Sequence, residues 1–139
     1  MLELKGVLLG LETVDKEQAI INIGKQMTEM GYVEDGYYDY MLERERKSTT
    51  YIGNYVAIPH GTLEGKSKVK NTGIIIHQYP NGVDFGNGNT AYFLIGIAGK
   101  NNEHVELIAN IADIIEDEDR VKELSKVESK QEIFNVFSI

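Results

Sequence analysis

The sequence predicts an α/β fold, in which a mixed, mostly buried β-sheet carries helices on both faces as a three-layer sandwich. Residues 72–78 and 91–98 are almost continuously apolar, which is typical of strands covered on both faces. Segments with helical spacing of apolar residues lie on either side of these strands, the clearest over residues 103–116. The 139 residues contain no low-complexity segment or internal repeat, so residues 1–139 are expected to form a single domain.

The N-terminal region predicts one short strand and one helix. Val-Leu-Leu at residues 7–9 is the expected strand. A helix should follow Thr13 or Asp15, because Asp15 and Gln18 have the spacing of a reciprocal cap and apolar residues then keep helical spacing. Gly31 is well placed to end this helix.

A second helix is predicted over residues 34–46. On it Tyr37, Met41 and Arg44 are spaced to share one face. Arg44 falls in the last turn, where a cation suits the helix dipole. Arg46 points away from Arg44 and is expected to lie on the surface.

The next predicted strand, residues 55–58, stops abruptly and presents a histidine. Pro59 cannot donate a backbone hydrogen bond, and Gly61 permits backbone angles closed to other residues. His60 is therefore expected at the carboxyl end of a strand, where open α/β sheets place their chemistry. Strands 72–78 and 91–98 follow, with turn signals at residues 81–82 and 86–89.

The C-terminal region predicts three helices, over residues 103–116, 119–127 and 129–137. Asn101 or Asn102 is expected to cap the first of them. Its apolar stripe is broad, which predicts a deeply packed helix. The stripe consists of Val105, Ile108, Ala109, Ala112 and Ile115, widened by Leu107, Ile111 and Ile114.

The charge and the composition exclude several classes of protein. A net charge of -8 without a basic run would repel nucleic acid. No apolar run approaches the ~20 residues that span a bilayer, and no signal pattern opens the chain, so we expect no membrane insertion and a cytoplasmic protein. The absence of cysteine excludes disulfides, cysteine-ligated zinc and a thiol nucleophile within these residues.

Three segments in order carry a resemblance to a known family. They are GNYVAIPHG at residues 53–61, GIIIHQYPNGV at residues 73–83 and GIAGKNNEH at residues 96–104. They resemble the IIA proteins of the bacterial phosphoenolpyruvate-dependent sugar phosphotransferase system, in the mannitol/fructose family and its mannitol branch. The likeness runs from about residue 8 to the C-terminus.

The resemblance implies a phosphocarrier without a cofactor or a metal ion. It would accept a phosphoryl group from phospho-HPr and pass it to a cysteine in the IIB domain of a membrane IICB permease for mannitol. Because this sequence has no cysteine, it would act as a free-standing IIA protein with a separate IIB partner.

The resemblance also assigns roles to site residues. His60 stands at the phosphorylated position, and His104 matches a histidine that orients or stabilises the phosphoryl group. Arg44 matches the arginine of the family, and a guanidinium can bind two phosphoryl oxygens at once. Asn54 and Gly61 are expected to support the phosphoryl site, although asparagine at position 54 cannot act as a base.

Four alternatives remain open from the sequence. A regulatory IIA protein of the nitrogen type and a fructose-specific IIA protein belong to the same family. A metal-dependent hydrolase would use His60, His104 and a carboxylate such as Glu103, but no HxxxH or HxH pair is present. An adaptor without chemistry would leave the three segments unexplained. His77, in an apolar strand, is expected to be structural.

Overall fold

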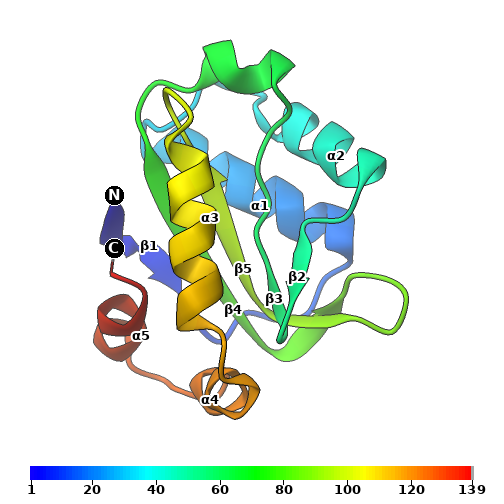
Figure 1. The fold of residues 1–139 in the computed structure, drawn as a ribbon, viewed down its shortest axis with the longest axis vertical. Helices are drawn as coiled ribbons and strands as arrows, with labels where there is room; N and C mark the ends of the chain where they lie inside the picture. The colour runs from blue at the N-terminus through cyan, green and yellow to red at the C-terminus, as the bar shows by residue number, and fades with distance from the viewer. Residues whose placement is uncertain (139) are drawn as a thin grey trace.

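The computed structural model describes residues 1–138, and the strands in that part of the chain form one mixed sheet in the order β1-β4-β5-β3-β2 (Figure 1). The strands are β1 (Leu2–Leu8), β2 (Tyr51–Gly53), β3 (Val56–Ala57), β4 (Gly73–Asp84) and β5 (Thr90–Ala98). The helices are α1 (Lys16–Glu29), α2 (Tyr38–Lys47), the 3-10 helix η1 (Glu64–Lys68), α3 (Glu103–Ile114), α4 (Glu118–Leu124) and α5 (Lys130–Phe137). β1 is parallel to β4 and β3 to β5, whereas β4–β5 and β2–β3 are antiparallel.

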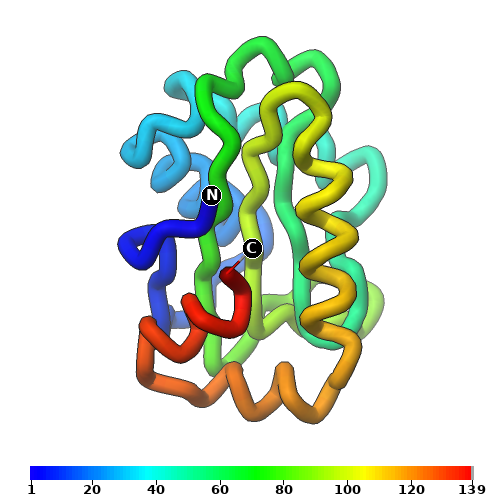
Figure 2. Tube along the Cα trace, turned by 60° about the vertical axis from the view of Figure 1, so that its left-hand side comes forward, coloured from blue at the N-terminus to red at the C-terminus, as the bar shows by residue number. Residues whose placement is uncertain are grey.

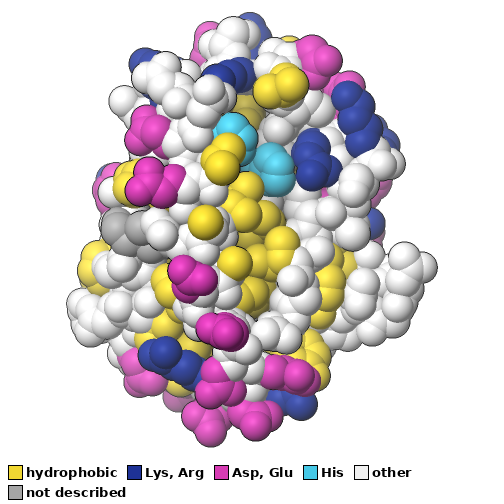
Figure 3. Space-filling model, viewed as in Figure 1, with side chains coloured by type: hydrophobic (Ala, Val, Ile, Leu, Met, Phe, Trp, Pro, Cys, Tyr) yellow, Lys and Arg dark blue, Asp and Glu magenta, His cyan; other side chains and the backbone are white. Residues whose placement is uncertain are grey.

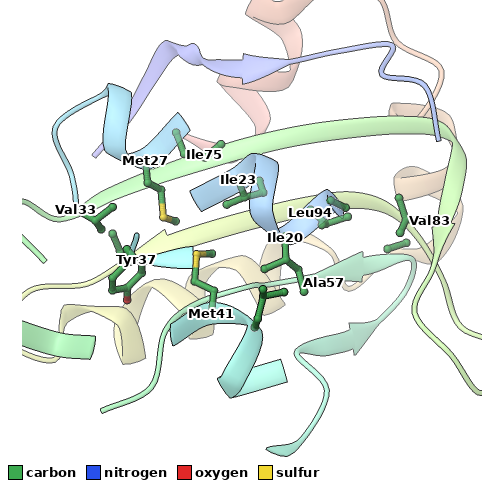
Figure 4. Close-up of a cluster of buried hydrophobic side chains, with 14 of the residues drawn as sticks. Ile20, Ile23, Met27, Val33, Tyr37, Met41, Ala57, Ile75, Val83 and Leu94 are labelled. Carbon is green, nitrogen blue, oxygen red and sulfur yellow. The ribbon is translucent and has the colours of Figure 1, made fainter. Parts of the chain in front are cut away.

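Helices cover both faces of the sheet, which confirms the predicted sandwich. α1 packs on β4 and β5 with α2 beside it, and α3 and α5 lie on the opposite face (Figure 1). Along β4, Ile75 belongs to the hydrophobic cluster under α1 (Figure 4), whereas Ile74 and Ile76 belong to the cluster under α3 and α5. Because both faces are buried, the strand reads as an apolar run.

The first helix forms about where the sequence predicts it, with half of the expected cap. The Asp15 side chain accepts a hydrogen bond from the Gln18 backbone N–H at 2.8 Å. The Gln18 side chain does not reach back to complete the cap but donates to Asn22 at 2.8 Å. Gly31, with φ +78°, follows the last turn and ends the helix as predicted.

Two N-terminal boundaries differ from the prediction. β1 starts at Leu2 rather than at residue 7, and its early residues are exposed because it is an edge strand, so they lack an apolar signal. α2 starts at Tyr38 rather than at residue 34. Gly36 has φ +82°, a left-handed conformation that an α-helix cannot include.

The middle of the chain holds a strand that the sequence analysis missed and a turn that it misassigned. β2 pairs with β3, and the predicted strand 55–58 is reduced to β3 because Asn54 and Tyr55 have φ +49° and +66° in the connecting turn. The predicted turn at residues 81–82 is a register shift inside a continuous β4. The chain reverses at residues 86–89 as predicted, where the Phe85 N–H donates to the Asn89 carbonyl at 2.8 Å.

The third helix is less deeply packed than its composition predicts. Val105 is 61% exposed and Ala109 and Ala112 are exposed, whereas Leu107 and Ile111 are buried. The broad stripe is therefore wrong, and α3 contacts the sheet along one narrow face. Asn102 occupies the N-cap position, one of the two predicted, but it is left-handed and its side chain makes no cap hydrogen bond.

The closing helices are close to the prediction. α4 covers residues 118–124 and not 119–127, because Asp117 caps it by accepting from the backbone N–H groups of Asp119 and Arg120. α5 follows Ser129, whose side chain accepts from the Glu132 backbone N–H. No helix in residues 1–138 has both the length and the apolar character needed to cross a membrane.

Candidate functional site

His60 lies just past the carboxyl end of β3, where β3 runs parallel to the central strand β5. The Pro59 carbonyl still accepts a hydrogen bond from the Ile97 backbone N–H at 3.0 Å, so the pairing with β5 continues almost to the histidine. After that, the chain leaves the sheet for η1. The sheet thus fixes the backbone just before His60, and the imidazole lies at the edge of the sheet.

One ring nitrogen of His60 is committed to the backbone. Nδ1 lies 2.7 Å from the Ile58 carbonyl oxygen, which can only accept, so in the neutral ring Nδ1 carries the proton and Nε2 has a free lone pair. Burial lowers the pKa of His60, and the charge of Arg44 and the nearby His104 act in the same direction. The Ile58 hydrogen bond and Glu45 oppose this shift. The balance favours a neutral imidazole with a nucleophilic Nε2.

His104 reaches the same edge of the sheet from the first turn of α3, which doubles back along β5 (Figure 2). The ring centroids of His60 and His104 are 6.3 Å apart with an interplanar angle of 27°. The turn is tight, since a Cβ added to Gly99 would lie 2.6 Å from the His104 backbone nitrogen. Asn101 and Asn102 take left-handed angles there, which asparagine tolerates well.

His60 and His104 line one pocket with a volume of about 290 Å³. Cationic side chains line this pocket too. Arg44 projects from α2 and donates from Nη1 to the Ser48 carbonyl at 2.5 Å. Lys66 of η1 donates to the side-chain oxygen of Asn102, and Lys47 also lines the pocket. Arg44 and Lys66 thus have neutral oxygens as partners, which leaves their positive charge available to an anion.

Three cations, Arg44, Lys47 and Lys66, and one carboxylate, Glu64, line the pocket, so its lining is net positive in a chain of net charge -8. The histidine side chains lie next to each other with Lys and Arg side chains nearby (Figure 3). The backbone N–H groups and the dipole at the start of α3 add to the attraction for an anion. A neutral imidazole, fixed cations and a helix start together suit a group that carries two negative charges, such as a phosphoryl group.

The structure brings together four of the five residues that the sequence analysis selected. His60, Gly61, His104 and Arg44 all line the pocket. Asn54 does not: its side-chain amide donates to the Ile115 carbonyl at 2.9 Å, at the C-terminal end of α3. That end lies ~17 Å along the helix from His104. The structure thus places Asn54 outside the pocket, with its side-chain amide bound to the carbonyls at the C-terminal end of α3.

Two other sequence-based readings can be compared with the structure. Arg46 lies on the surface as expected, with Nη2 3.2 Å from the Glu17 carboxylate. His77 is buried in β4, where Nε2 lies 2.5 Å from the Gln26 side-chain oxygen. Among residues 1–138, no group of three or more His, Asp or Glu side chains is arranged to hold a metal ion. The ligand set of a metal-dependent hydrolase is thus not assembled there.

Several pocket residues escaped the sequence analysis. Lys66 and Thr62 belong to the segment between β3 and β4, where no pattern predicted η1. Lys47 is the last residue of α2, just beyond the predicted end of that helix. Tyr37 was noted only for sharing a face with Arg44, although it also contacts Gly61.

A histidine with a free Nε2, beside a second histidine and several cations at the edge of an α/β sheet, suits a protein that carries a phosphoryl group on histidine. The chain belongs to the family described as phosphoenolpyruvate-dependent sugar phosphotransferase system, EIIA 2, whose sequence model matches residues 1–138.

Several similar proteins in this family are named as mannitol IIA proteins. The chain is 44% identical over 138 residues to the mannitol-specific phosphotransferase enzyme IIA component of Geobacillus stearothermophilus, covering 99% of this chain and 95% of that protein. The crystal structure of IIA mannitol from Escherichia coli superposes with a TM-score of 0.93 at 38% identity and covers 99% of both chains. A complex of enzyme IIAMTL and phosphorylated enzyme IIBMTL from Escherichia coli also matches, with a TM-score of 0.93, 37% identity and 99% of both chains covered.

Proposed function

We propose that this chain is a phosphocarrier of a mannitol phosphotransferase system. His60 accepts a phosphoryl group from phospho-HPr and passes it to a cysteine in the IIB domain of a mannitol permease. The observation that carries the proposal is the His60 ring, whose Nδ1 is bound to the Ile58 carbonyl while Nε2 is free beside Arg44 and His104. The names of the similar proteins support the mannitol assignment.

The transfer exchanges one bond to phosphorus for another. The lone pair of Nε2 attacks the phosphorus of phospho-HPr, the new N–P bond forms, and the bond from phosphorus to the HPr histidine breaks. The Nδ1 proton stays in its hydrogen bond to the Ile58 carbonyl throughout. In the second step a cysteine thiolate of IIB attacks the same phosphorus, and His60 leaves as a neutral imidazole.

The neighbours of His60 have separate roles in this proposal. The Arg44 guanidinium binds the equatorial phosphoryl oxygens, where negative charge is concentrated in the transition state. His104 donates a hydrogen bond to the phosphoryl group in transit but does not carry it. Lys47 and Lys66 raise the local positive potential, which favours the arrival of an anionic donor.

The surroundings of the pocket suit a protein partner. Leu63, which lines the pocket, is 79% exposed, and Val105, next to His104, is 61% exposed. Apolar side chains around a polar centre are the usual anatomy of a protein–protein interface. Both partners must reach the same histidine, so HPr and IIB would use this surface in turn. That exchange implies a cytoplasmic location for the chain.

The alternatives within the family have less support. A regulatory IIA protein of the nitrogen type from Neisseria meningitidis shares the fold at 22% identity, too distant to indicate a common role. The more similar proteins have mannitol-specific names rather than regulatory or fructose-specific ones. The proposal therefore keeps sugar uptake as the function.

The test is phosphorylation in a reconstituted system. The chain is incubated with phosphoenolpyruvate, enzyme I and HPr, and its intact mass is measured before and after brief acid treatment. We expect a gain of about 80 Da that acid removes. His60→Ala should gain nothing, whereas the matched variant His77→Gln should gain the same mass as the wild type. A full gain in His60→Ala would contradict the assignment.

A further inference from the structure

Glu45 in the last turn of α2 is a buried glutamate that the proposed transfer does not use. Its side chain is 4% exposed, and it follows Arg44 directly in the chain. One carboxylate oxygen, Oε1, accepts hydrogen bonds from the backbone N–H of Thr50 at 2.9 Å and from the Thr50 hydroxyl at 2.6 Å. The other oxygen lies 3.5 Å from Nζ of Lys16, at the start of α1. Because a buried charge is costly unless donors surround it, these contacts hold the carboxylate in one place.

Thr50 connects this carboxylate to the sheet. Thr50 is buried just before β2, and its carbonyl accepts a hydrogen bond from the Ile58 backbone N–H at 3.0 Å. This bond continues the antiparallel pairing of β2 with β3. The Ile58 carbonyl in turn lies 2.7 Å from Nδ1 of His60. Hydrogen bonds therefore join Glu45, Thr50, Ile58 and His60 in series.

Arg44 is tied to the same short segment. Residues 48–50 connect α2 to β2 (Figure 1), and the carbonyl of Ser48 accepts a hydrogen bond from Nη1 of Arg44. Glu45 holds Thr50 at the other end of this segment. The guanidinium and the imidazole are thus both linked to a stretch of backbone that one buried carboxylate anchors.

We propose that Glu45 is a positioning residue for His60: by holding Thr50 it fixes the Ile58 carbonyl, which keeps the proton on Nδ1 and leaves Nε2 free beside Arg44. Glu45 acts through Thr50 and Ile58 and does not touch the phosphoryl group. The inference rests on the proposed function of His60 as the phosphoryl acceptor. It also gives a reason for a buried carboxylate at a position where an apolar side chain would cost less to bury.

Two substitutions at position 45 separate the hydrogen bonds from the charge. Glu45→Gln keeps an acceptor oxygen for Thr50 but loses the charge, whereas Glu45→Met has a similar length and loses both. An effect common to both variants therefore belongs to the charge and its ion pair with Lys16. A difference between the variants belongs to the hydrogen bonds with Thr50.

The first measurement is single-turnover phosphorylation by phospho-HPr. We expect Glu45→Met to react roughly two- to tenfold more slowly than Glu45→Gln, which is the effect of losing about one neutral hydrogen bond. The matched control is Glu17→Met, the same change at an exposed glutamate of α1 that pairs with Arg46. This control should react at the wild-type rate.

A second measurement, ¹⁵N NMR, reports on the imidazole and needs no phosphorylation. Glu45→Gln should keep His60 as the Nδ1–H tautomer, and Glu45→Met should show a larger share of the Nε2–H tautomer. Hydrogen exchange at the Ile58 amide should also be faster in Glu45→Met, since this N–H donates to the Thr50 carbonyl. A role in stability alone would lower the free energy of unfolding and leave the tautomer of the folded protein unchanged.

Equal rates and equal tautomers in folded Glu45→Gln and Glu45→Met would overturn the inference. A slower Glu45→Met with the Ile58 amide exchange of Glu45→Gln would also overturn it, because the effect would not pass through Thr50. If Glu45→Met does not fold, Thr50→Val removes only the hydroxyl bond to Glu45 and should shift the tautomer in the same direction; a wild-type tautomer and rate would again overturn the inference. If the wild type is never phosphorylated on His60, the proposed function fails, while the tautomer comparison still tests the role of Glu45.

Discussion

Buried His77 should make the stability of the protein depend on pH in the acid range. Its side chain is 2% exposed, with Nε2 2.5 Å from the Gln26 side-chain oxygen and Nδ1 without a partner among the described residues. Burial lowers the pKa of His77 from 6.5 to about 4. The perturbation is therefore acidification, and the matched variant is His77→Gln, which keeps an N–H donor for Gln26 but does not titrate.

The sign and the size of this pH effect on the free energy of unfolding follow from proton linkage. Below pH 6.5 the unfolded chain takes up a proton on His77, whereas the folded protein does so only near pH 4. Between these values the unfolded state binds more protons, so the free energy of unfolding falls as the pH falls. From pH 7 to pH 4.5 His77 should account for a loss of about 2.5 kcal/mol.

The assay is urea unfolding of the wild type and His77→Gln at both pH values. Because His60 and the carboxylates are common to both proteins, their contributions cancel in the comparison. The wild type should lose about 2.5 kcal/mol more than the variant on acidification. Equal losses in the two proteins would refute the reasoning, since they would mean that His77 titrates alike in the folded and unfolded states.

Three further predictions concern the site. Arg44→Lys should fold normally but accept the phosphoryl group roughly ten- to a hundredfold more slowly, because lysine cannot bind two oxygens at once; equal single-turnover rates would remove Arg44 from the site. His104→Ala should still be phosphorylated on His60 but pass the group to purified IIB roughly ten- to a hundredfold more slowly, as rapid-quench transfer would show; an unchanged rate would assign His104 to the helix turn alone. Asn54→Asp should lower the free energy of unfolding by about 1–3 kcal/mol, because a carboxylate cannot donate to the carbonyls that end α3, while transfer by the folded protein stays unchanged; a loss of transfer without a loss of stability would return position 54 to the site.

The sequence was most informative where local chemistry decides the structure. Pro59 and Gly61 around one histidine predicted a strand that ends at a presented side chain, and the structure has that arrangement. The spacing of apolar residues over residues 103–116 predicted a helix packed against the rest of the fold. The family resemblance assigned His60 and His104 to one phosphoryl site, and their ring centroids are 6.3 Å apart.

Contacts between distant segments account for what the sequence could not predict. Asn54 was expected at the site from the family resemblance, but its partner carbonyl, at Ile115, is 61 residues away in the chain. Lys66 enters the pocket from η1, whose polar sequence has no helical periodicity. The contact of Tyr37 with Gly61 depends on how α2 docks, which no local pattern determines.

The central claim is that Nε2 of His60 carries the phosphoryl group. The most direct measurement is ¹⁵N NMR of histidine-labelled protein after phosphorylation by phosphoenolpyruvate, enzyme I and HPr. The account predicts that the phosphorus-coupled nitrogen is Nε2 of His60, while Nδ1 keeps its proton and its hydrogen bond to the Ile58 carbonyl. A phosphoryl group on Nδ1 of His60, or on His104, would contradict it.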